Sequence, residues 1–353
     1  MKWNQAWERA SNPRPIVIIG AGGIVRSAHI PAYRKLEYPI AGVYDIRSDA
    51  ALDTASAFGI GVIFSSIDKA VSLPGTVFDI AVPGNQILSV LERLPDGAAT
   101  LIQKPMGENL AEARKILGLC RAKKLKAAIN FQLRFSPNML ALRDMLARKA
   151  LGTVTDIEVR LVDRQPWQLW PFLKGAPRLE VLYHSIHYLD AIRFLFGEPQ
   201  GVLCKAIAHP EMAELRDTRS SIILDYGNRI RCSLTLNHAH RHNEKHQASE
   251  FKVEGTTGAA FLTLGVNLDY PAGKPDTLEV ALGAFDWETL PLRGSWFIEA
   301  FEGPISNLQR FVSGEDDVLI TSVDDAIRTM ALVEACYDSS NFPTTPIPSC
   351  DAL

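Results

Sequence analysis

The stretch Ile16-Val17-Ile18-Ile19-Gly20-Ala21-Gly22-Gly23-Ile24-Val25 decides the fold of the N-terminal part of the chain. Four consecutive apolar, β-branched residues are typical of a strand that is buried on both faces. The glycine-rich turn leads into residues 26–36, whose pattern predicts a helix that is interrupted near Pro31. A strand, Gly20-x-Gly22 and a helix form the arrangement that binds a pyrophosphate. Gly20 permits the tight turn, and Gly22 lets the backbone approach the phosphates.

The residues around this turn indicate a dinucleotide. The third glycine of the usual motif serves helix–strand packing, and the apolar Val25 replaces it here without removing the anion site. Asp45 follows Gly22 by 23 residues, close to the distance at which a carboxylate meets the adenosine ribose hydroxyls. This carboxylate would repel the 2′-phosphate of NADP and favours NAD, whereas Arg47 could bind that phosphate, so NADP remains open. The alternative is a plain structural turn.

Up to about residue 126, strand patterns alternate with helix patterns. The strands are expected at 16–19, 40–45, 62–64, 78–82 and 100–102, and the helices between them at 48–58, 67–71, 87–94 and 111–122. This alternation indicates βαβ units. We therefore expect residues 1–126 to form an α/β Rossmann domain with a parallel sheet.

From about residue 127, strand patterns follow one another. They lie at 154–162, 202–209, 220–226, 230–240, 249–254 and 259–264, with helices expected at 181–196, 298–312 and 323–338. Strands that follow strands favour antiparallel pairing. Residues 127–353 are therefore expected to form an α+β substrate-binding and oligomerisation domain with a largely antiparallel open sheet. The boundary rests on the change of pattern alone.

Composition excludes several classes of protein. Lys plus Arg total 37 against 40 Asp plus Glu, which is not the basic excess that a nucleic-acid or anionic membrane surface needs. The five cysteines are scattered without a CxxC pair, so we interpret them as reduced thiols. The N-terminal residues lack the apolar segment of a signal peptide, and no stretch resembles a transmembrane helix. We expect a cytoplasmic protein.

Lys104 follows the strand predicted at 100–102 and directly precedes Pro105. Gln103-Lys104-Pro105, together with the glycine-rich motif, resembles the glucose–fructose oxidoreductase, inositol dehydrogenase and rhizopine catabolism family (Gfo/Idh/MocA), which usually has Glu-Lys-Pro here. The resemblance spans nearly the whole chain and continues at residues 134–137 and 151–154, around His187, and at residues 253–258 and 322–326.

The resemblance implies that Lys104 lies beside the nicotinamide and the reacting hydroxyl, and that the chain forms a homodimer or homotetramer through the C-terminal sheet. Physical chemistry agrees with this role. An ammonium stabilises a developing alkoxide, and burial lowers its pKa towards proton exchange; a solvated surface lysine is the alternative. The residues expected to contact the cofactor are Gly20, Gly22, Gly23, Ile24, Asp45, Arg47, Pro83 and Lys104.

The predicted helix 181–196 carries further candidates. Tyr183, His187 and Asp190 stand at i, i+4 and i+7 and would share one face, whereas His184 points elsewhere. Family members commonly carry Asp-x-x-x-His-x-x-Asp here, and Tyr183 takes the place of the first Asp. We expect His187 to accept the hydroxyl proton, with Tyr183 next or acting jointly if Lys104 lowers its pKa. Alternatively, His187 has a structural role. Asp190 is expected to orient His187 or a helix neighbour.

Candidates for substrate contacts lie on both sides of the second predicted domain's first strand. Tryptophan faces stack on sugar rings, and arginine anchors hydroxyls or a carboxylate. The candidate substrate-binding residues are Arg134, Arg164, Trp167, Trp170, Tyr183 and His187. A salt-bridging arginine at position 134 and a packed connection between domains at 164–170 explain these residues equally well.

His238, His240 and His242 alternate along the sequence, with His246 beyond them. Three histidines on one face of a strand could hold zinc. No cysteine or acidic residue has convincing ligand spacing, and hydride transfer to nicotinamide needs no metal. We therefore expect no metal site here and favour a polar sheet face or a subunit contact.

Taken together, the motifs predict an NAD(P)-dependent oxidoreductase that transfers a hydride between nicotinamide and a carbinol or carbonyl carbon. The expected partner is a small molecule: a sugar, polyol, cyclitol or sugar acid. One alternative is a tightly bound dinucleotide used for transient oxidation, in a hydrolase or a sugar–sugar oxidoreductase. Another is a non-catalytic, dinucleotide-sensing regulator, against which the presence of both Lys104 and His187 counts.

Overall fold

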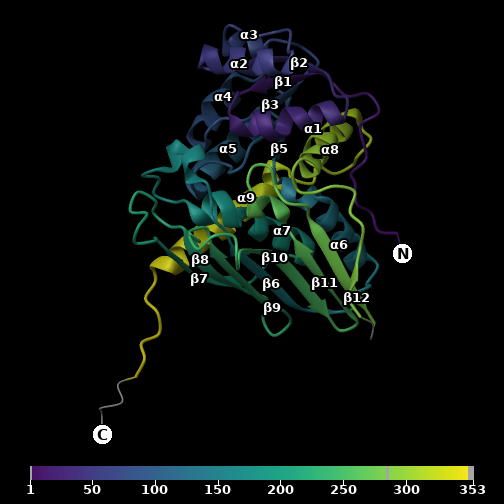
Figure 1. Cartoon of the computed structure of the whole chain (residues 1–353). Helices are drawn as coiled ribbons and strands as arrows, with labels where there is room; N and C mark the ends of the chain where they lie inside the picture. Colours follow the sequence, from purple (N-terminus) through teal and green to yellow (C-terminus); the bar gives the residue numbers. More distant parts are fainter. Residues whose placement is uncertain (1, 284–285, 349–353) are drawn as a thin grey trace.

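The N-terminal part of the chain folds around a five-stranded parallel sheet, sheet A (Figure 1). The computed structural model describes residues 2–283 and 286–348. The strands are β1 (Ile16–Ile19), β2 (Ile40–Tyr44), β3 (Val77–Ile80), β4 (Ala99–Ile102) and β5 (Lys126–Ile129), in the order β2-β1-β3-β4-β5. The predicted Rossmann-type parallel sheet is confirmed.

Helices cover both faces of sheet A, and this explains why β1 is apolar along its whole length. Val17 and Ile19 pack towards α3 (Ile67–Val71), α4 (Ile87–Arg93) and α5 (Leu110–Ala122). Ile16 and Ile18 lie in a second core with residues of α1 (Ile30–Lys35), α2 (Ser48–Phe58) and α8 (Glu302–Ser313). Since side chains alternate along a strand, two covered faces require an unbroken apolar run.

Two local expectations for sheet A need correction. The segment predicted as a strand at 62–64 forms only a single parallel bridge, between Ile63 and Val43. It cannot extend further along β2, because α3 begins at Ile67. The predicted helix after the glycine turn begins as a π-helix at Val25–His29 and continues as α1. Pro31 lies in the first turn of α1, where its missing N–H group is tolerated.

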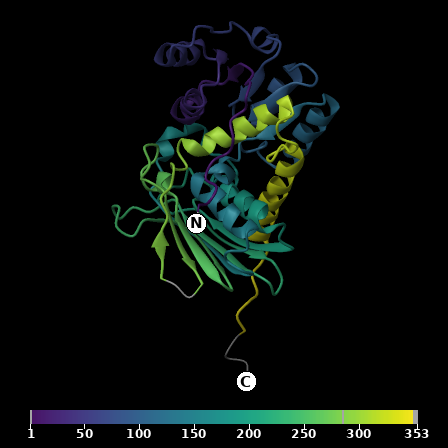
Figure 2. The same ribbon diagram turned by 90° about the vertical axis from the view of Figure 1, so that its right-hand side faces the viewer.

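The second sheet, sheet B, has eight strands and is largely antiparallel, as predicted. Its strands are β6 (Val154–Val162), β7 (Gly201–Ile207), β8 (Arg219–Asp225), β9 (Arg231–Asn237), β10 (Ala248–Gly255), β11 (Gly258–Thr263), β12 (Thr277–Leu282) and β13 (Glu288–Thr289). Among the described strand pairs of sheet B, only β6 and β9 are parallel. The helices lie on the side of sheet B that faces sheet A, and the opposite side lies at the edge of the molecule (Figures 1 and 2).

The chain does not divide cleanly at residue 126. That position lies within β5, which pairs with β4 in sheet A, so the first strand series extends to Ile129. The helix α8 also returns to sheet A, where Ile305 and Leu308 join the core beside Ile18 (Figure 2). Sheet A and its helices are therefore built from both ends of the chain.

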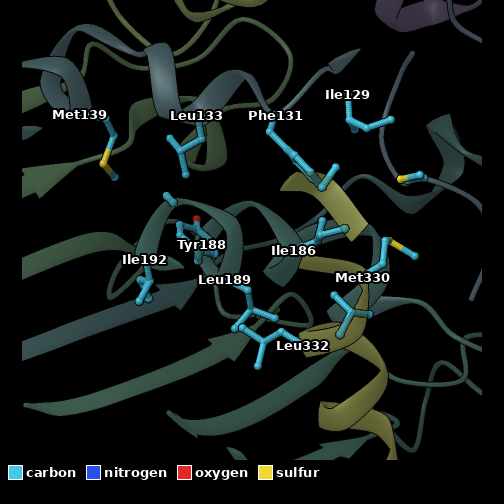
Figure 3. Close-up of a cluster of buried hydrophobic side chains, with 14 of the residues drawn as sticks. Ile129, Phe131, Leu133, Met139, Ile186, Tyr188, Leu189, Ile192, Met330 and Leu332 are labelled. Atoms are coloured by element: carbon cyan, nitrogen blue, oxygen red, sulfur yellow. The ribbon is translucent and has the colours of Figure 1, made fainter. Parts of the chain in front are cut away.

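The two sheets share one continuous apolar core. Its central part is contributed by the segment after β5 and by the helices α6 (Pro137–Ala147), α7 (Ile186–Phe196) and α9 (Val323–Asn341) (Figure 3). The labelled side chains are Ile129, Phe131, Leu133, Met139, Ile186, Tyr188, Leu189, Ile192, Met330 and Leu332. The four described cysteines are free and buried, and Cys350 lies outside the described residues. Among the described helices, none combines the length and the apolar character needed to span a membrane.

Arg134 forms a buried ion-pair network at this junction. Its guanidinium donates two hydrogen bonds of 2.6 Å to Asp190 of α7, one of 2.5 Å to Asp325 of α9 and one of 3.1 Å to the Ile320 carbonyl. Asp190 also accepts a hydrogen bond of 2.7 Å from Thr329. The substrate-binding prediction for Arg134 is therefore wrong, because its donors are used within the protein. Asp190 is expected to orient His187 or a helix neighbour; its carboxylate binds Arg134 and not His187, and it lies 4.0 Å from the guanidinium of Arg193 on the same helix.

We expect Arg134→Met to lower the free energy of unfolding by roughly 3–5 kcal/mol, because it leaves the buried Asp190 without its counter-charge. Urea denaturation followed by circular dichroism measures this loss. The matched control is Arg231→Met, which removes an arginine that pairs with Asp156 and Glu158 at the surface and should change the free energy of unfolding much less. Equal effects of the two substitutions would contradict the assignment.

Candidate active site

The carboxyl ends of β1, β3 and β4 lie at one edge of the parallel sheet A, and Lys104, two residues after β4, reaches the segment just before α7. The chain enters the sheet at β1, which lies next to the edge strand β2, and the neighbouring strands β2 and β3 lie on opposite sides of it. Ligands of open α/β sheets bind outside the carboxyl ends of the strands at such a reversal of strand order. This edge carries the glycine turn, Pro83 and Lys104, which are three of the predicted features.

The glycine turn has the shape that a pyrophosphate needs. Gly20 has a φ of +104°, and a Cβ atom there would lie 2.3 Å from the carbonyl oxygen of Ala81, so only glycine fits. At Gly22 and Gly23, by contrast, a Cβ atom would meet no atom within 4 Å. The helix that begins here has unpaired N–H groups in its first turn. The open surface over Gly22 and Gly23 therefore fits the phosphates of a dinucleotide.

Asp45 connects the end of β2 to this turn. One carboxylate oxygen accepts a hydrogen bond of 2.7 Å from the Ala21 amide, and the other accepts one of 2.8 Å from the Arg47 amide. The carboxylate is therefore fixed beside the glycine turn and keeps lone pairs for ribose hydroxyls. The side chain of Arg47 is exposed.

Lys104 extends from the end of β4 across to the second sheet's helices. The Gln103 amide continues the sheet ladder to Ile80, and the Gln103 side chain accepts a hydrogen bond of 3.0 Å from the Lys104 amide. The Lys104 ammonium donates a hydrogen bond of 2.6 Å to the carbonyl oxygen of Tyr183. Burial lowers the pKa of Lys104 to about 8, which suits proton exchange near neutral pH.

The segment that receives this hydrogen bond is not the regular helix that the sequence predicts. Residues Val181–Ser185 form a π-helix, and α7 begins at Ile186. Single π turns are rare and frequently occur at functional sites. The expected common face of Tyr183, His187 and Asp190 is wrong: Tyr183 packs beside Phe172, His187 against Trp296, and Asp190 on Arg134.

The condition under which Tyr183 could exchange a proton, a pKa lowered by Lys104, is not met. Burial, followed by the charges of Glu108 and Glu112, raises the pKa of Tyr183 to about 12. Lys104 binds the backbone carbonyl of this residue and leaves the phenol beside the two carboxylates. Tyr183 is therefore a weak proton acceptor in this arrangement.

His187 is 8% exposed, and its ring lies edge-on to Trp296 with a centroid distance of 5.3 Å. Its Nδ1 atom is buried and has no hydrogen-bond partner among the described residues. Burial and then the charge of Lys104 hold the pKa of His187 well below its usual value. At neutral pH the imidazole is therefore uncharged, with one N–H donor and one acceptor nitrogen, and it can hydrogen-bond a substrate hydroxyl.

A second histidine pair lies next to these groups. The rings of His184 and His238 have centroids 4.5 Å apart, and Trp167 is edge-on to His184 at 5.1 Å. The Nδ1 atom of His238 lies 2.9 Å from an oxygen of Asp163. The sequence pattern predicts that His184 lies off the helix face that carries His187, and it gives no indication that His184 packs against His238. The polar Asp163 directly after β6 could have been noted as a candidate.

The four histidines from 238 to 246 do not share one face. His238 is buried, whereas His240 and His242 line a surface cavity of about 430 Å³ together with His209, Arg219 and Arg241. The strand β9 ends at Asn237, so strand alternation does not apply beyond it. Within residues 2–283 and 286–348, no group of three or more His, Cys, Asp or Glu side chains is arranged to hold a metal ion.

The predicted substrate segment is only partly at the site. Trp167 is buried in a small core with Leu173, Leu179 and Leu215, which fits the packed-connection alternative. Trp170 is partly exposed and lies between His184 and Tyr270, with ring centroids 6.2 and 5.1 Å away. Arg164 is exposed beyond β6. Trp296 was missed, because no sequence motif marks the loop before α8.

Comparisons with known proteins agree with this geometry. Residues 14–131 match the family model described as oxidoreductase family, NAD-binding Rossmann fold, and residues 139–261 match the GFO/IDH/MocA C-terminal domain. The chain is 26% identical over 337 residues to D-apiose dehydrogenase of Paraburkholderia graminis, covering 92% of this chain and 86% of that protein. It is 26% identical over 191 residues to inositol 2-dehydrogenase of Rhizobium meliloti, covering 51% and 54%.

The fold also matches a solved structure. An oxidoreductase from Agrobacterium radiobacter, in complex with NAD⁺, L-tartaric acid and magnesium, superposes with a TM-score of 0.77 at 19% sequence identity. The match covers 93% of this chain and 96% of that protein. At this identity the likeness establishes the shared fold.

We expect Gly22→Val to weaken NAD binding at least about tenfold, or ~1.4 kcal/mol, while the thermal unfolding midpoint stays unchanged. The reason is that the new side chain has room in the protein but fills the surface over the glycine turn. Isothermal titration calorimetry and thermal unfolding measure the two quantities. Gly20→Ala is the contrasting variant, since its Cβ clashes with Ala81 and should lower the unfolding midpoint. Unweakened NAD binding by Gly22→Val would contradict the cofactor assignment.

Proposed function

This chain belongs to the Gfo/Idh/MocA oxidoreductase family, and on that premise we propose that it is an NAD-dependent dehydrogenase of a sugar, polyol or cyclitol. The observation that carries the proposal is the position of Lys104, a buried amine with a pKa of about 8, beside the neutral His187 and at the strand edge that bears the glycine turn. The dehydrogenase names of relatives that share the fold support a carbinol substrate.

Lys104 and His187 have different roles in the proposed oxidation. When bound, NAD supplies the hydride acceptor for the substrate carbon, and this redox chemistry is the cofactor's own. The amine of Lys104 takes the hydroxyl proton during oxidation and returns it during reduction, because its pKa is near the working pH. The neutral imidazole of His187 hydrogen-bonds the reacting oxygen and orients it. The sequence-based prediction makes His187 the proton acceptor. We assign this role to Lys104 instead, because burial and then the charge of Lys104 disfavour a positive charge on His187.

Asp45 supports a preference for NAD over NADP. Its carboxylate is held beside the Ala21 amide, where it can accept from ribose hydroxyls and would repel a 2′-phosphate. Arg47 is close in sequence but exposed, and its side chain makes no ion pair among the described residues.

The open face of sheet B supports self-association. Leu203 and Ile207 of β7 are 67% and 44% exposed, and Ile223 of β8, which is paired with Leu203, is 51% exposed. Exposed apolar side chains that cluster on a flat sheet are typical of an interface. We infer that a second copy of this chain covers this face, as the family resemblance implies.

The proposed proton exchange predicts a pH dependence. Oxidation requires Lys104 without its proton, so kcat/KM for oxidation should rise with pH through an inflection near 8, and kcat/KM for reduction should fall there. Steady-state rates measured from NADH absorbance between pH 6 and 10 check both directions. A fall in the oxidation rate above pH 8 would instead mean that the charged ammonium is the active form.

A substrate screen tests the function itself. We expect NADH formation with at least one member of a panel of sugars, polyols, cyclitols and sugar acids, and slower reaction with NADP. Lys104→Met should lower kcat/KM by about 10²–10⁴-fold, the usual contribution of a positioned acid–base group. Full turnover by this variant would contradict the acid–base role of Lys104. Cofactor that co-elutes with the protein and is reduced without net NADH release would favour transient oxidation instead.

A further inference from the structure

His184 takes no part in the proton exchange proposed above, yet it lies against the same buried groups. Its ring packs on His238 and is flanked by the edges of Trp167 and Trp170. Lys104 and His187 are near enough for their charges to act on it. His184 therefore lies in the same cluster of buried polar groups as the reactive amine.

His238 is held as an imidazolium by two buried carboxylates. Its Nδ1 atom lies 2.9 Å from Asp163, its Nε2 atom lies 3.4 Å from Glu180, and all three side chains are at most 1% exposed. Burial by itself would lower the pKa of His238, but Asp163 and then Glu180 outweigh it and raise the pKa to about 10. Both ring nitrogens therefore carry protons at neutral pH.

Burial and the neighbouring charge on His238 keep His184 neutral. Two imidazolium rings 4.5 Å apart in a buried site would repel each other strongly. Burial first, then His238, Lys104 and His187, hold the pKa of His184 well below its usual value. The carboxylates of Asp163 and Glu180 contact His238, so they compensate the charge of that ring.

The hydrogen bonding of His184 identifies the nitrogen that carries its one proton. The side-chain amide nitrogen of Gln165 lies 3.4 Å from Nδ1 of His184. An amide nitrogen can only donate, so Nδ1 accepts and the proton is on Nε2. That Nε2 atom is buried and has no partner among the described residues. A buried donor without an acceptor costs about 1–3 kcal/mol, which a ligand oxygen would recover.

We propose that the Nε2–H group of His184 binds a second oxygen of the substrate, a hydroxyl or carboxylate oxygen other than the reacting one. His238, with Asp163 and Glu180, is a positioning unit that keeps His184 neutral and in the donor tautomer. This inference rests on the proposed function and assigns a residue to a second oxygen of the sugar, polyol or cyclitol. A simple monohydric alcohol leaves this donor unpaired and is a poor substrate.

The tautomer can be measured without turnover. The chain has eight histidines, and ¹⁵N-histidine labelling with His184→Gln and His238→Asn as assignment variants resolves their ring nitrogens by NMR. We expect His184 to carry its proton on Nε2 alone and His238 to be doubly protonated from pH 6 to 9. In His238→Asn, His184 should begin to titrate at a higher pH than in the wild type. A proton on Nδ1 of His184, or no response to His238→Asn, would overturn the positioning role.

Kinetics test the substrate contact. We expect His184→Phe to raise KM for the best polyol at least about tenfold, with the inflection near pH 8 unmoved, and to reduce the preference for polyols over monohydric alcohols. His184→Gln, which keeps a side-chain donor, should retain part of that preference. His242→Phe, at the surface cavity, is the matched control and should change nothing. If His184→Phe keeps the wild-type preference for polyols over monohydric alcohols, this inference is overturned and the proposed function stands. If the wild type forms no NADH with any compound, the proposed function is overturned, and the NMR measurement still decides the tautomer of His184.

Discussion

The hydrogen bond from the Lys104 ammonium to the Tyr183 carbonyl oxygen connects the two halves of the candidate site. Lys104 follows β4 of sheet A, and Tyr183 belongs to the π turn before α7, which packs against sheet B. Because the amine reaches across the junction, it is removed from water and its pKa falls to about 8. The reactivity of Lys104 therefore depends on how the two sheets pack, and the Arg134 ion pairs and the shared core in Figure 3 fix that packing.

Buried polar groups near the junction are of two kinds. Arg134 and Asp190 are satisfied by each other, by Asp325 and by Thr329, so they hold helices together and have nothing left for a ligand. His187 and His184, in contrast, each have a buried ring nitrogen without a partner in the part of the chain that the structure describes. Buried polar atoms in folded proteins are nearly always paired. Because His187 and His184 also lie within range of the Lys104 charge, we propose that these two rings bind the substrate.

Sequence patterns predicted what depends on local physics. The β-branched run at Ile16–Ile19 and the glycine turn follow from burial and backbone conformation, and both are as expected. The strand β5 was missed because its sequence, Lys126-Ala127-Ala128-Ile129, has a single β-branched residue and begins with a charge. The π turn was missed because its apolar spacing is that of an ordinary helix. The Arg134–Asp190 pair joins residues 56 positions apart, and no local pattern records such a contact.

The most direct test of the central claim changes the basicity of the amine at position 104 and keeps its position. Lys104→Cys, alkylated with 2-bromoethylamine, restores a side chain of nearly the same length whose amine is less basic because sulfur withdraws electrons. If Lys104 exchanges the substrate proton, the inflection in kcat/KM for oxidation moves from about 8 in the wild type to a lower pH in the alkylated variant. Wild-type protein treated in the same way should keep its profile. An inflection that stays near pH 8 in the alkylated variant would assign the proton exchange to another group and contradict the account.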